Sequence, residues 1–147
     1  MKTTIQPIIW QGRPFPKKEL IAFLLKQKQQ KIEKWEQDII EFTLDWLNDD
    51  ITKFEVFTSG STGTPKSITI NREQMRASAK ATFKALDLKK GNSALLVLPA
   101  KFIAGKMMIV RAIELGMDLH YFPPQINVLA HINQHFDFTA LIPLQVQ

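Results

Sequence analysis

A short segment near the middle of the chain combines glycine, hydroxyl and lysine side chains as a phosphate site requires. A polyphosphate brings several negative charges close to the protein, so its site needs unobstructed backbone amides, hydroxyl donors and a cation. Gly60 and Gly63 permit close approach of the backbone, and Lys66 can neutralise phosphate charge. The segment therefore predicts a phosphate-binding loop. Its hydroxyl groups belong to Thr58, Ser59, Ser61, Thr62 and Thr64.

The Walker A loop of P-loop NTPases is the nearest general alternative, and it fits this segment poorly. Its pattern is a first glycine, four residues of any type, and then glycine, lysine and serine or threonine. Counted from Gly60, the second glycine position holds Pro65, which has no backbone N–H to donate. The residues that follow, 67–70, predict a strand, whereas a Walker loop leads into the N-terminus of a helix. We reject the Walker interpretation, and an ordinary surface turn is the remaining simple alternative.

The same segment resembles the signature of the adenylate-forming superfamily, which includes acyl-CoA synthetases, luciferases and the adenylation domains of peptide synthetases. That signature is a hydroxyl residue, Ser-Gly, a hydroxyl residue, Thr-Gly, any residue and Pro-Lys, and Thr58 through Lys66 fill every place. The resemblance covers roughly residues 54–147. It implies that the loop grips the β- and γ-phosphates of ATP while a substrate carboxylate attacks the α-phosphorus, giving an acyl-adenylate and pyrophosphate.

Within this superfamily, residues 98–107 (LPAKFIAGKM), 110–112 and 139–145 (TALIPLQ) look most like the o-succinylbenzoate–CoA ligases of menaquinone biosynthesis. Phe102 stands where relatives often have a histidine that lines the acyl pocket, so it can form an apolar wall but cannot donate a hydrogen bond. Lys106 and Arg111 are candidates for holding the second carboxylate of a succinyl-type acid. A solvated or ion-paired position on a helix is the simpler explanation for both.

The resemblance also implies the partners: a small carboxylic acid, ATP with Mg²⁺, and CoA. The segments that bind magnesium and CoA, and the catalytic lysine, belong to parts of the superfamily fold outside these 147 residues. We therefore expect no catalytic residue in this chain, which by itself should be an inactive N-terminal part of a longer ligase. Two alternatives stay open: a ligase for another carboxylic acid, and a non-catalytic module that binds ATP or pyrophosphate.

The elements around the loop are predicted from apolar periodicity. Asn71 is a candidate helix cap that Gln74 can complete as a capping box, and Gly91 and Gly116 are candidate helix ends. An extended piece at residues 8–10 should end in a Gly/Pro turn. Helices are expected over residues 17–30, 31–47, 71 to about 89, 103–115 and 126–134, and strands over 53–57, 67–70, 94–98, 119–122 and 138–143.

Strands that alternate with helices after residue 53 predict an α/β fold with helices packed on a mainly parallel sheet. By resemblance this is an incomplete N-terminal subdomain of the adenylate-forming fold. We interpret residues 1–147 as one partial AMP-binding domain. Residues 1–50 form a helical N-terminal segment, and residues 51–147 form the α/β core with the phosphate loop.

Composition excludes several other classes of protein. The net charge of +5 favours anionic partners, yet most lysines lie on predicted helix faces, and no recognition motif or interleaved exposed aromatics indicate nucleic-acid binding. The absence of cysteine excludes disulfides and thiolate zinc sites. His131 and His135 are four residues apart but lack a third ligand, so no metal site is predicted.

No stretch approaches the roughly 18 to 20 apolar residues of a membrane span, and the N-terminus does not read as a signal peptide. We expect a soluble, cytoplasmic protein with no membrane partner. Homodimerisation stays open.

Overall fold

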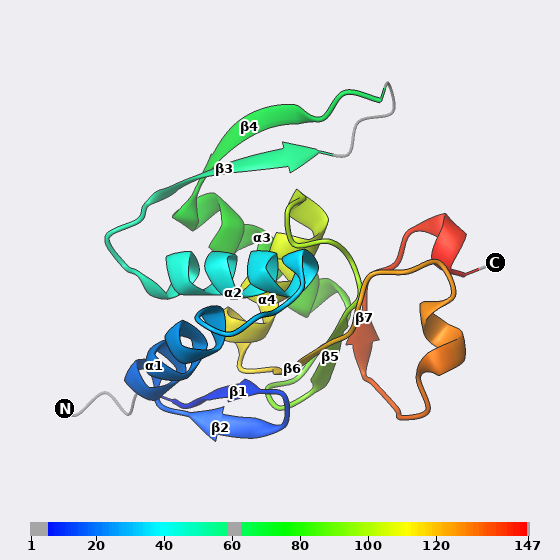
Figure 1. Cartoon of the computed structure of the whole chain (residues 1–147), viewed down its shortest axis with the longest axis horizontal. Coiled ribbons are helices and arrows are strands. Elements are labelled where there is room, and N and C mark those ends of the chain that lie inside the picture. The colour runs from blue at the N-terminus through cyan, green and yellow to red at the C-terminus, as the bar shows by residue number, and fades with distance from the viewer. Residues whose placement is uncertain (1–5, 59–62, 147) are drawn as a thin grey trace.

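A five-stranded sheet and a separate two-stranded hairpin organise the chain, seen in a computed structural model that describes residues 6–58 and 63–146 (Figure 1). The strand order in the larger sheet is β2-β1-β6-β5-β7. β1 pairs antiparallel with β2, and every other neighbouring pair is parallel, so the predicted mainly parallel sheet is confirmed. Its strands are β1 (Ile8–Trp10), β2 (Arg13–Phe15), β5 (Ser93–Leu96), β6 (Asp118–Tyr121) and β7 (Phe138–Thr139).

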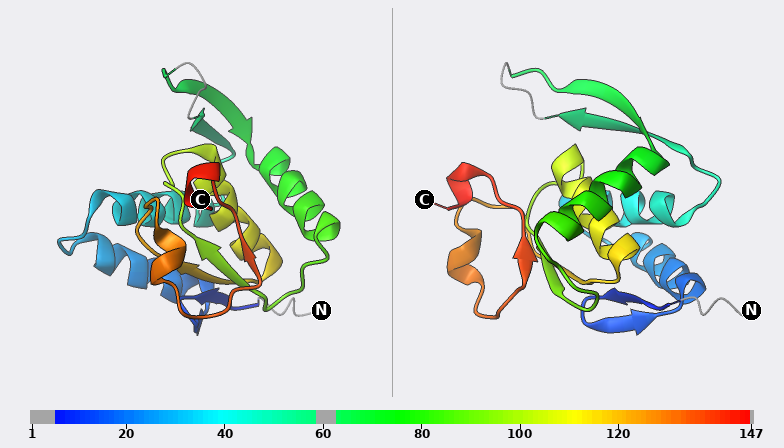
Figure 2. Two further views of the ribbon diagram at one scale, coloured as in Figure 1. Left: turned by 90° about the vertical axis from the view of Figure 1, so that its right-hand side faces the viewer. Right: turned by 180° about the vertical axis from the view of Figure 1, so that it is seen from behind.

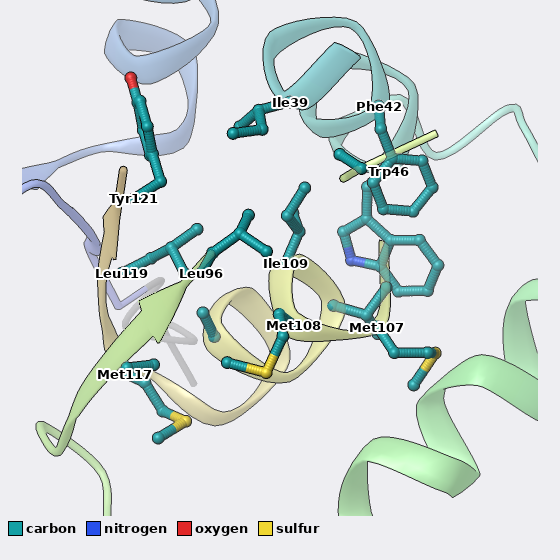
Figure 3. Close-up of a cluster of buried hydrophobic side chains, with 14 of the residues drawn as sticks. Ile39, Phe42, Trp46, Leu96, Met107, Met108, Ile109, Met117, Leu119 and Tyr121 are labelled. Atoms are coloured by element: carbon teal, nitrogen blue, oxygen red, sulfur yellow. The ribbon is translucent and has the colours of Figure 1, made fainter. Parts of the chain in front are cut away.

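One face of this sheet carries the helices and the main core. Successive side chains of a strand point to opposite faces of a sheet. Ala94 and Leu96 of β5 point toward the helices, as do Leu119 and Tyr121 of β6. Figure 3 shows Ile39 and Ile109 beside Leu96, and Trp46 beside Phe42 and Met107. The helices are α1 (Lys17–Lys28), α2 (Lys34–Leu47), α3 (Arg72–Ala85) and α4 (Ile103–Leu115).

Among the described residues, the opposite face of the sheet is covered by a loop-rich stretch, residues 122–146, which we call the covering segment. Leu95 and Val97 point to this side and pack against Val128. The covering segment contains β7 and two short 3-10 helices, η1 (Val128–His131) and η2 (Pro143–Gln145). The two faces are therefore unequally protected, with four helices on one and a single irregular segment on the other (Figure 2).

The strands that flank the predicted phosphate loop do not enter the large sheet. β3 (Lys53–Thr58) and β4 (Lys66–Asn71) pair antiparallel as a hairpin that lies on the far side of the helices (Figure 1). Residues 53–57 and 67–70 were predicted as strands, and both predictions are confirmed. Their pairing follows from the short connection, which suits an antiparallel neighbour, whereas a parallel one needs a crossover.

Two of the three predicted helix signals are confirmed. The Asn71 side chain accepts from the Gln74 amide at 2.8 Å, and the Asn71 amide donates to the Gln74 side chain at 3.0 Å, which completes the capping box. Gly116 ends α4 in the left-handed conformation, with φ of 68°. The predicted end of α3 near Gly91 is wrong: the helix stops at Ala85 and Asp87 takes a positive φ of 49°.

Other helix and strand boundaries also differ from those predicted from the apolar periodicity. The helix predicted over residues 126–134 is only η1, because Val128 and Ile132 pack on the flat sheet face and a helix so short is marginal without a packed stripe. β7 stops at Thr139 instead of reaching residue 143. β2, which was not predicted, contains Pro14, and Pro is tolerated there because β2 is an edge strand. α2 begins at Lys34, three residues after the predicted start.

Arg72 joins the hairpin to the helices. Its guanidinium and side-chain N–H donate to the backbone oxygens of Trp46 at 2.8 Å, Asn48 at 2.9 Å and Ile51 at 2.9 Å. It also lies over the Trp46 ring at 4.3 Å. The carbonyls of Trp46 and Asn48 lie at the end of α2, which has no basic residue of its own in its last turn, so Arg72 supplies positive charge and donors there.

Within the described ranges, no helix combines the length and apolar character needed to cross a lipid bilayer.

Candidate functional site

A cavity of about 330 Å³ opens at the carboxyl ends of the parallel strands. Open α/β sheets usually bind ligands at this edge, because the loops that leave the strands there diverge and leave a crevice. One group of lining residues follows β5, a second follows β6 and a third follows β7. The lining consists of Leu98, Pro99, Phe102 and Ala104, then Pro124, Gln125 and Ile126, then Ile142 and Gln145.

The cavity wall is mostly apolar, and none of the described residues that line it carries a charged side chain. Its buried polar side chain, Gln145, is already engaged: its Nε2 donates to Val97 O at 3.0 Å and to Gln125 O at 3.3 Å, and its Oε1 accepts from Ile142 N at 3.1 Å. These bonds hold η2 against the end of β5 and leave little hydrogen-bonding capacity for a ligand. The cavity therefore suits the apolar body of a small molecule.

Gly105 on α4 sets the shape of one side of this cavity. A Cβ at this position would lie 2.3 Å from Pro99 O and 2.9 Å from Ala100 Cα, which are backbone atoms that cannot rotate away. The lack of a side chain lets the first turn of α4 pack directly beneath the turn that follows β5. Leu98 and Pro99 are thereby fixed where they line the cavity.

The base of the predicted phosphate loop lies next to this cavity. Phe57, the second-last residue of β3, forms an isolated parallel bridge with Phe102, which lines the cavity and caps the start of α4. Thr58, the first predicted loop residue, is therefore one residue from the bridge. The free N–H groups and positive end of α4 lie at the same place.

Of the predicted phosphate-binding residues, the structure describes Thr58, Gly63, Thr64 and Lys66. Thr58 and Lys66 are cross-strand partners in the hairpin, so the loop leaves and re-enters the ladder between them. Gly63 has φ of +85°, and no other heavy atom lies within 4 Å of an added Cβ, so its backbone conformation favours glycine although space does not require it. Ser59, Gly60, Ser61 and Thr62 lie outside the described residues.

The three predicted acyl-pocket residues are not gathered in one place. Phe102 lines the apolar cavity, but Lys106 and Arg111 do not. Lys106 Nζ donates to Ala100 O at 2.6 Å and lies 5.0 Å from the centre of the Phe42 ring, and burial lowers its pKa. It lines a second cavity of about 400 Å³ between α2 and the hairpin, together with Asp38 and Asp45.

Arg111 lies farther along α4 and faces β7. Its Nη1 donates to Met108 Sδ at 3.7 Å, and its guanidinium carbon lies 6.0 Å from the centre of the Phe138 ring. Burial lowers the pKa of this guanidinium, and its Nε is buried without a hydrogen-bond partner among the described residues. The predicted role of Lys106 and Arg111 in holding a carboxylate stays a prediction.

Two residues that shape the site were not singled out by chemistry in the sequence. Gly105 gives no local signal, because it sits inside a helix where glycine usually marks only reduced stability. Gln145 belongs to the stretch 139–145 that carries the family resemblance, so its position could have been suspected, but its bonds to Val97 and Gln125 depend on tertiary contacts.

A metal-binding cluster does not appear in the part of the chain that the structure describes, where no three His, Asp or Glu side chains gather suitably. The nearest acidic side chain on the hairpin, Glu55, accepts from Ser67 Oγ at 2.5 Å. The described loop residues offer a lysine and hydroxyl groups, which fit phosphate oxygens better than a divalent cation.

Comparison with known proteins gives a consistent assignment. The model of a family described as AMP-binding enzyme matches residues 3–143. A solved structure titled acyl-CoA synthetase (AMP-forming)/AMP-acid ligase II-like protein, from Dyadobacter fermentans DSM 18053, is 40% identical, with a TM-score of 0.74. The match covers 82% of this chain and 35% of that chain, so the sequence spans about a third of its length.

A second solved structure, the inhibitor-bound N-terminal domain of FACL13 from Mycobacterium tuberculosis, is 25% identical over 52% of this chain and 19% of that chain, with a TM-score of 0.45. A search of curated proteins finds no match.

Proposed function

Since this chain belongs to the AMP-binding enzyme family, we propose that it forms the phosphate-holding part and one wall of the acid pocket of an ATP-dependent acid–CoA ligase. The observation that carries the proposal is the bridge between Phe57 and Phe102. It places the base of a loop suited to phosphate beside an apolar cavity suited to the body of a carboxylic acid. Adenylation requires these two substrates side by side.

In this proposal the loop residues hold the leaving pyrophosphate. Lys66 neutralises charge that develops on the β- and γ-phosphates, and Thr58, Thr64 and the amide of Gly63 donate hydrogen bonds to phosphate oxygens. Ser59, Gly60, Ser61 and Thr62 complete the loop. The positive end of α4, next to the loop base, favours the same anion. The acid carboxylate then attacks the α-phosphorus, the bond to the bridging oxygen breaks, and pyrophosphate leaves.

ATP is the cofactor that the described residues fit. Mg²⁺ would supply further positive charge to the phosphates, and its protein ligands would come from other parts of the family fold. CoA would enter for the second half-reaction, in which its thiol attacks the acyl-adenylate and releases AMP. This chain contributes position and charge to these steps, and its own residues handle no proton. By itself it should not complete the reaction.

The finer proposal is that the acid is o-succinylbenzoate. Two of the three stretches that resemble o-succinylbenzoate–CoA ligases, residues 98–107 and 139–145, contribute to the wall of the same cavity, whereas residues 110–112 do not. Their convergence supports a shared acid pocket. The second carboxylate of this substrate would need a cation, and the candidates in this chain are Lys106 and Arg111.

A different carboxylic acid is the second candidate, favoured by the lining of the cavity. No charged side chain contributes to that lining, so an acid with one carboxylate and an apolar body would fit without an uncompensated charge.

The test uses a chimera in which this chain replaces the matching part of the Dyadobacter fermentans protein. AMP formation from ATP and CoA is measured with o-succinylbenzoate, with benzoate and without acid. The proposal predicts AMP only when an acid is present. A preference for o-succinylbenzoate supports the finer assignment, and a preference for benzoate supports the second candidate. Phosphate binding without AMP from a broad acid panel would instead favour a non-catalytic nucleotide-binding module.

A further inference from the structure

Lys106 on α4 has a half-buried ammonium group that does not line the apolar cavity. Its Nζ donates to Ala100 O at 2.6 Å and lies 5.0 Å from the centre of the Phe42 ring. Burial lowers its pKa, while the charges of Asp38 and Asp45 favour the protonated form. Lysine on a helix surface usually keeps its ammonium in water. Here the ammonium is directed to a backbone carbonyl of the protein instead.

The acceptor of this bond lies in the turn that follows β5, residues 97–102. Ala100 is 1% exposed, so water cannot readily replace a donor that its carbonyl loses. In the same turn, Leu98, Pro99 and Phe102 line the apolar cavity, and Phe102 N donates to Pro99 O at 3.3 Å. A bond that fixes the Ala100 carbonyl therefore fixes backbone on either side of it, from which the cavity wall projects.

Two successive residues of α4 hold this turn. Gly105 packs directly beneath it, since a Cβ there would lie 2.3 Å from Pro99 O. Lys106 then reaches Ala100 O with its ammonium. Close packing limits only how near the turn can come, whereas a hydrogen bond from a charged donor also limits its direction. The contact between this ammonium and the Phe42 ring ties the turn to α2 as well.

Phe102 links the position of the turn to the phosphate loop. It lines the apolar cavity and forms the bridge with Phe57 at the base of the loop. Lys101 Nζ lies 5.0 Å from the centre of the Phe102 ring. A shift of the turn would therefore move the cavity wall relative to the loop. In adenylation the acid carboxylate must meet the α-phosphorus, and a misplacement of about 1 Å can cost about 100-fold in rate.

We propose that Lys106 is a positioning residue of the acid pocket: its ammonium holds the Ala100 carbonyl and thereby sets Phe102 beside the phosphate loop, without touching the acid. This inference rests on the proposed function and narrows it. Because Lys106 is engaged by the turn, Arg111 is left as the candidate in this chain for a second carboxylate. The pocket then depends on Lys106 equally for acids with one carboxylate and for acids with two.

The test compares benzoate, with one carboxylate, and o-succinylbenzoate, with two, in the chimera that carries this chain. Lys106→Met keeps the apolar stem and removes the donor. We expect kcat/KM to fall about tenfold or more for both acids, as for the loss of a hydrogen bond from a charged donor, with the ratio between the acids unchanged. Lys106→Arg keeps donors of similar reach and should restore most of the activity.

Lys53→Met is the matched control, because Lys53 lines the same second cavity as Lys106. It should leave kcat/KM unchanged for both acids. Circular dichroism establishes that each variant is folded, and Lys106→Gln, which removes the charge and shortens the donor, carries the comparison if Lys106→Met is unfolded.

Amide hydrogen exchange in the 147-residue chain, measured by NMR, provides a readout that needs no catalysis. Lys106→Met should speed exchange at the Phe102 amide, which donates to Pro99 O, by about tenfold and leave exchange in β6 unchanged. The control Lys53→Met should leave both unchanged.

Three outcomes would overturn the proposal. A loss of activity confined to o-succinylbenzoate would show that Lys106 contacts the second carboxylate directly. Unchanged kcat/KM in a folded Lys106→Met enzyme would show that its bond to Ala100 only adds stability. Unchanged exchange at Phe102 would show that the turn keeps its position without Lys106. If the unaltered chimera makes no AMP from any acid, the proposed function fails, and the exchange measurement alone decides whether Lys106 holds the turn.

Discussion

The guanidinium of Arg72 reaches the end of α2 and the residue that leads into β3, so this one side chain holds a helix and a hairpin together. We predict that Arg72→Ala lowers the free energy of unfolding by about 3 kcal/mol, since it leaves several buried carbonyls without donors. Lys80→Ala on an exposed position of the same helix is the control. Urea denaturation measures both, and equal stabilities would contradict the assigned role.

Asp137 makes a contribution to stability that depends on pH. Its Oδ2 accepts from Ser93 N at 2.8 Å, and its Oδ1 lies 3.2 Å from His135 Nε2. The Ser93 backbone bond, assisted by His135, lowers the pKa of Asp137 below its ordinary value of 3.8. Because the folded chain then binds fewer protons than the unfolded chain, this contribution is present above about pH 4 and is lost as the pH falls through the folded pKa.

The corresponding prediction concerns Asp137→Asn. The unaltered chain should lose stability between about pH 4 and pH 2, and Asp137→Asn should show a smaller loss over that range. Urea midpoints measured at several pH values provide the test, with Asp50→Asn in the exposed 48–51 turn as the control. The assignment fails if Asp137→Asn and the unaltered chain lose stability in parallel.

At the scale of elements, the packing of α4 against the turn after β5 defines the candidate acid pocket. We predict that Gly105→Ala costs about 1–3 kcal/mol, because the new Cβ would meet Pro99 O at 2.3 Å and α4 must shift. Ala104→Ser is a control at the neighbouring, exposed position. Thermal unfolding measures the cost, and an unchanged melting temperature for Gly105→Ala would show that the turn yields without strain.

Element types were largely predictable from the sequence, and element boundaries were not. The thirteen residues of α4 were predicted to the residue, because an apolar stripe begins after Phe102 and Gly116 ends it in the left-handed conformation. The end of α3 was misplaced, since Asp87 adopts a positive φ that its type only weakly favours. The covering segment was predicted as a helix and a longer strand, but its apolar residues follow the flat sheet surface.

The candidate site was only partly predictable, because one part of it is contiguous in the sequence and the other part is not. The hydroxyl, glycine and lysine residues of the loop are contiguous, so their pattern is visible in the sequence. The cavity, in contrast, is assembled from three segments that follow β5, β6 and β7. Its connection to the loop is one bridge between Phe57 and Phe102, which are 45 positions apart in the sequence. No local pattern encodes that pairing.

At the scale of the whole molecule, the position of each strand in the sheet predicts unequal stability. Amide hydrogen exchange should be slowest in β5 and β6, whose strands pair on both sides, and faster in β7 at the edge. Mass spectrometry of pepsin fragments can compare these strands in the isolated chain. Uniform protection across all three strands would contradict the weaker pairing expected of β7 at the edge of the sheet.

The proposed function requires the hairpin loop to hold phosphate, and Lys66 tests this requirement most directly. Lys53, at the base of the same hairpin and also exposed, provides a matched control. In the chimera described above, AMP formation should fall about 100-fold for Lys66→Ala, as for the loss of a transition-state donor, and stay near the unaltered rate for Lys53→Ala. Equal rates for the two variants would contradict the assignment.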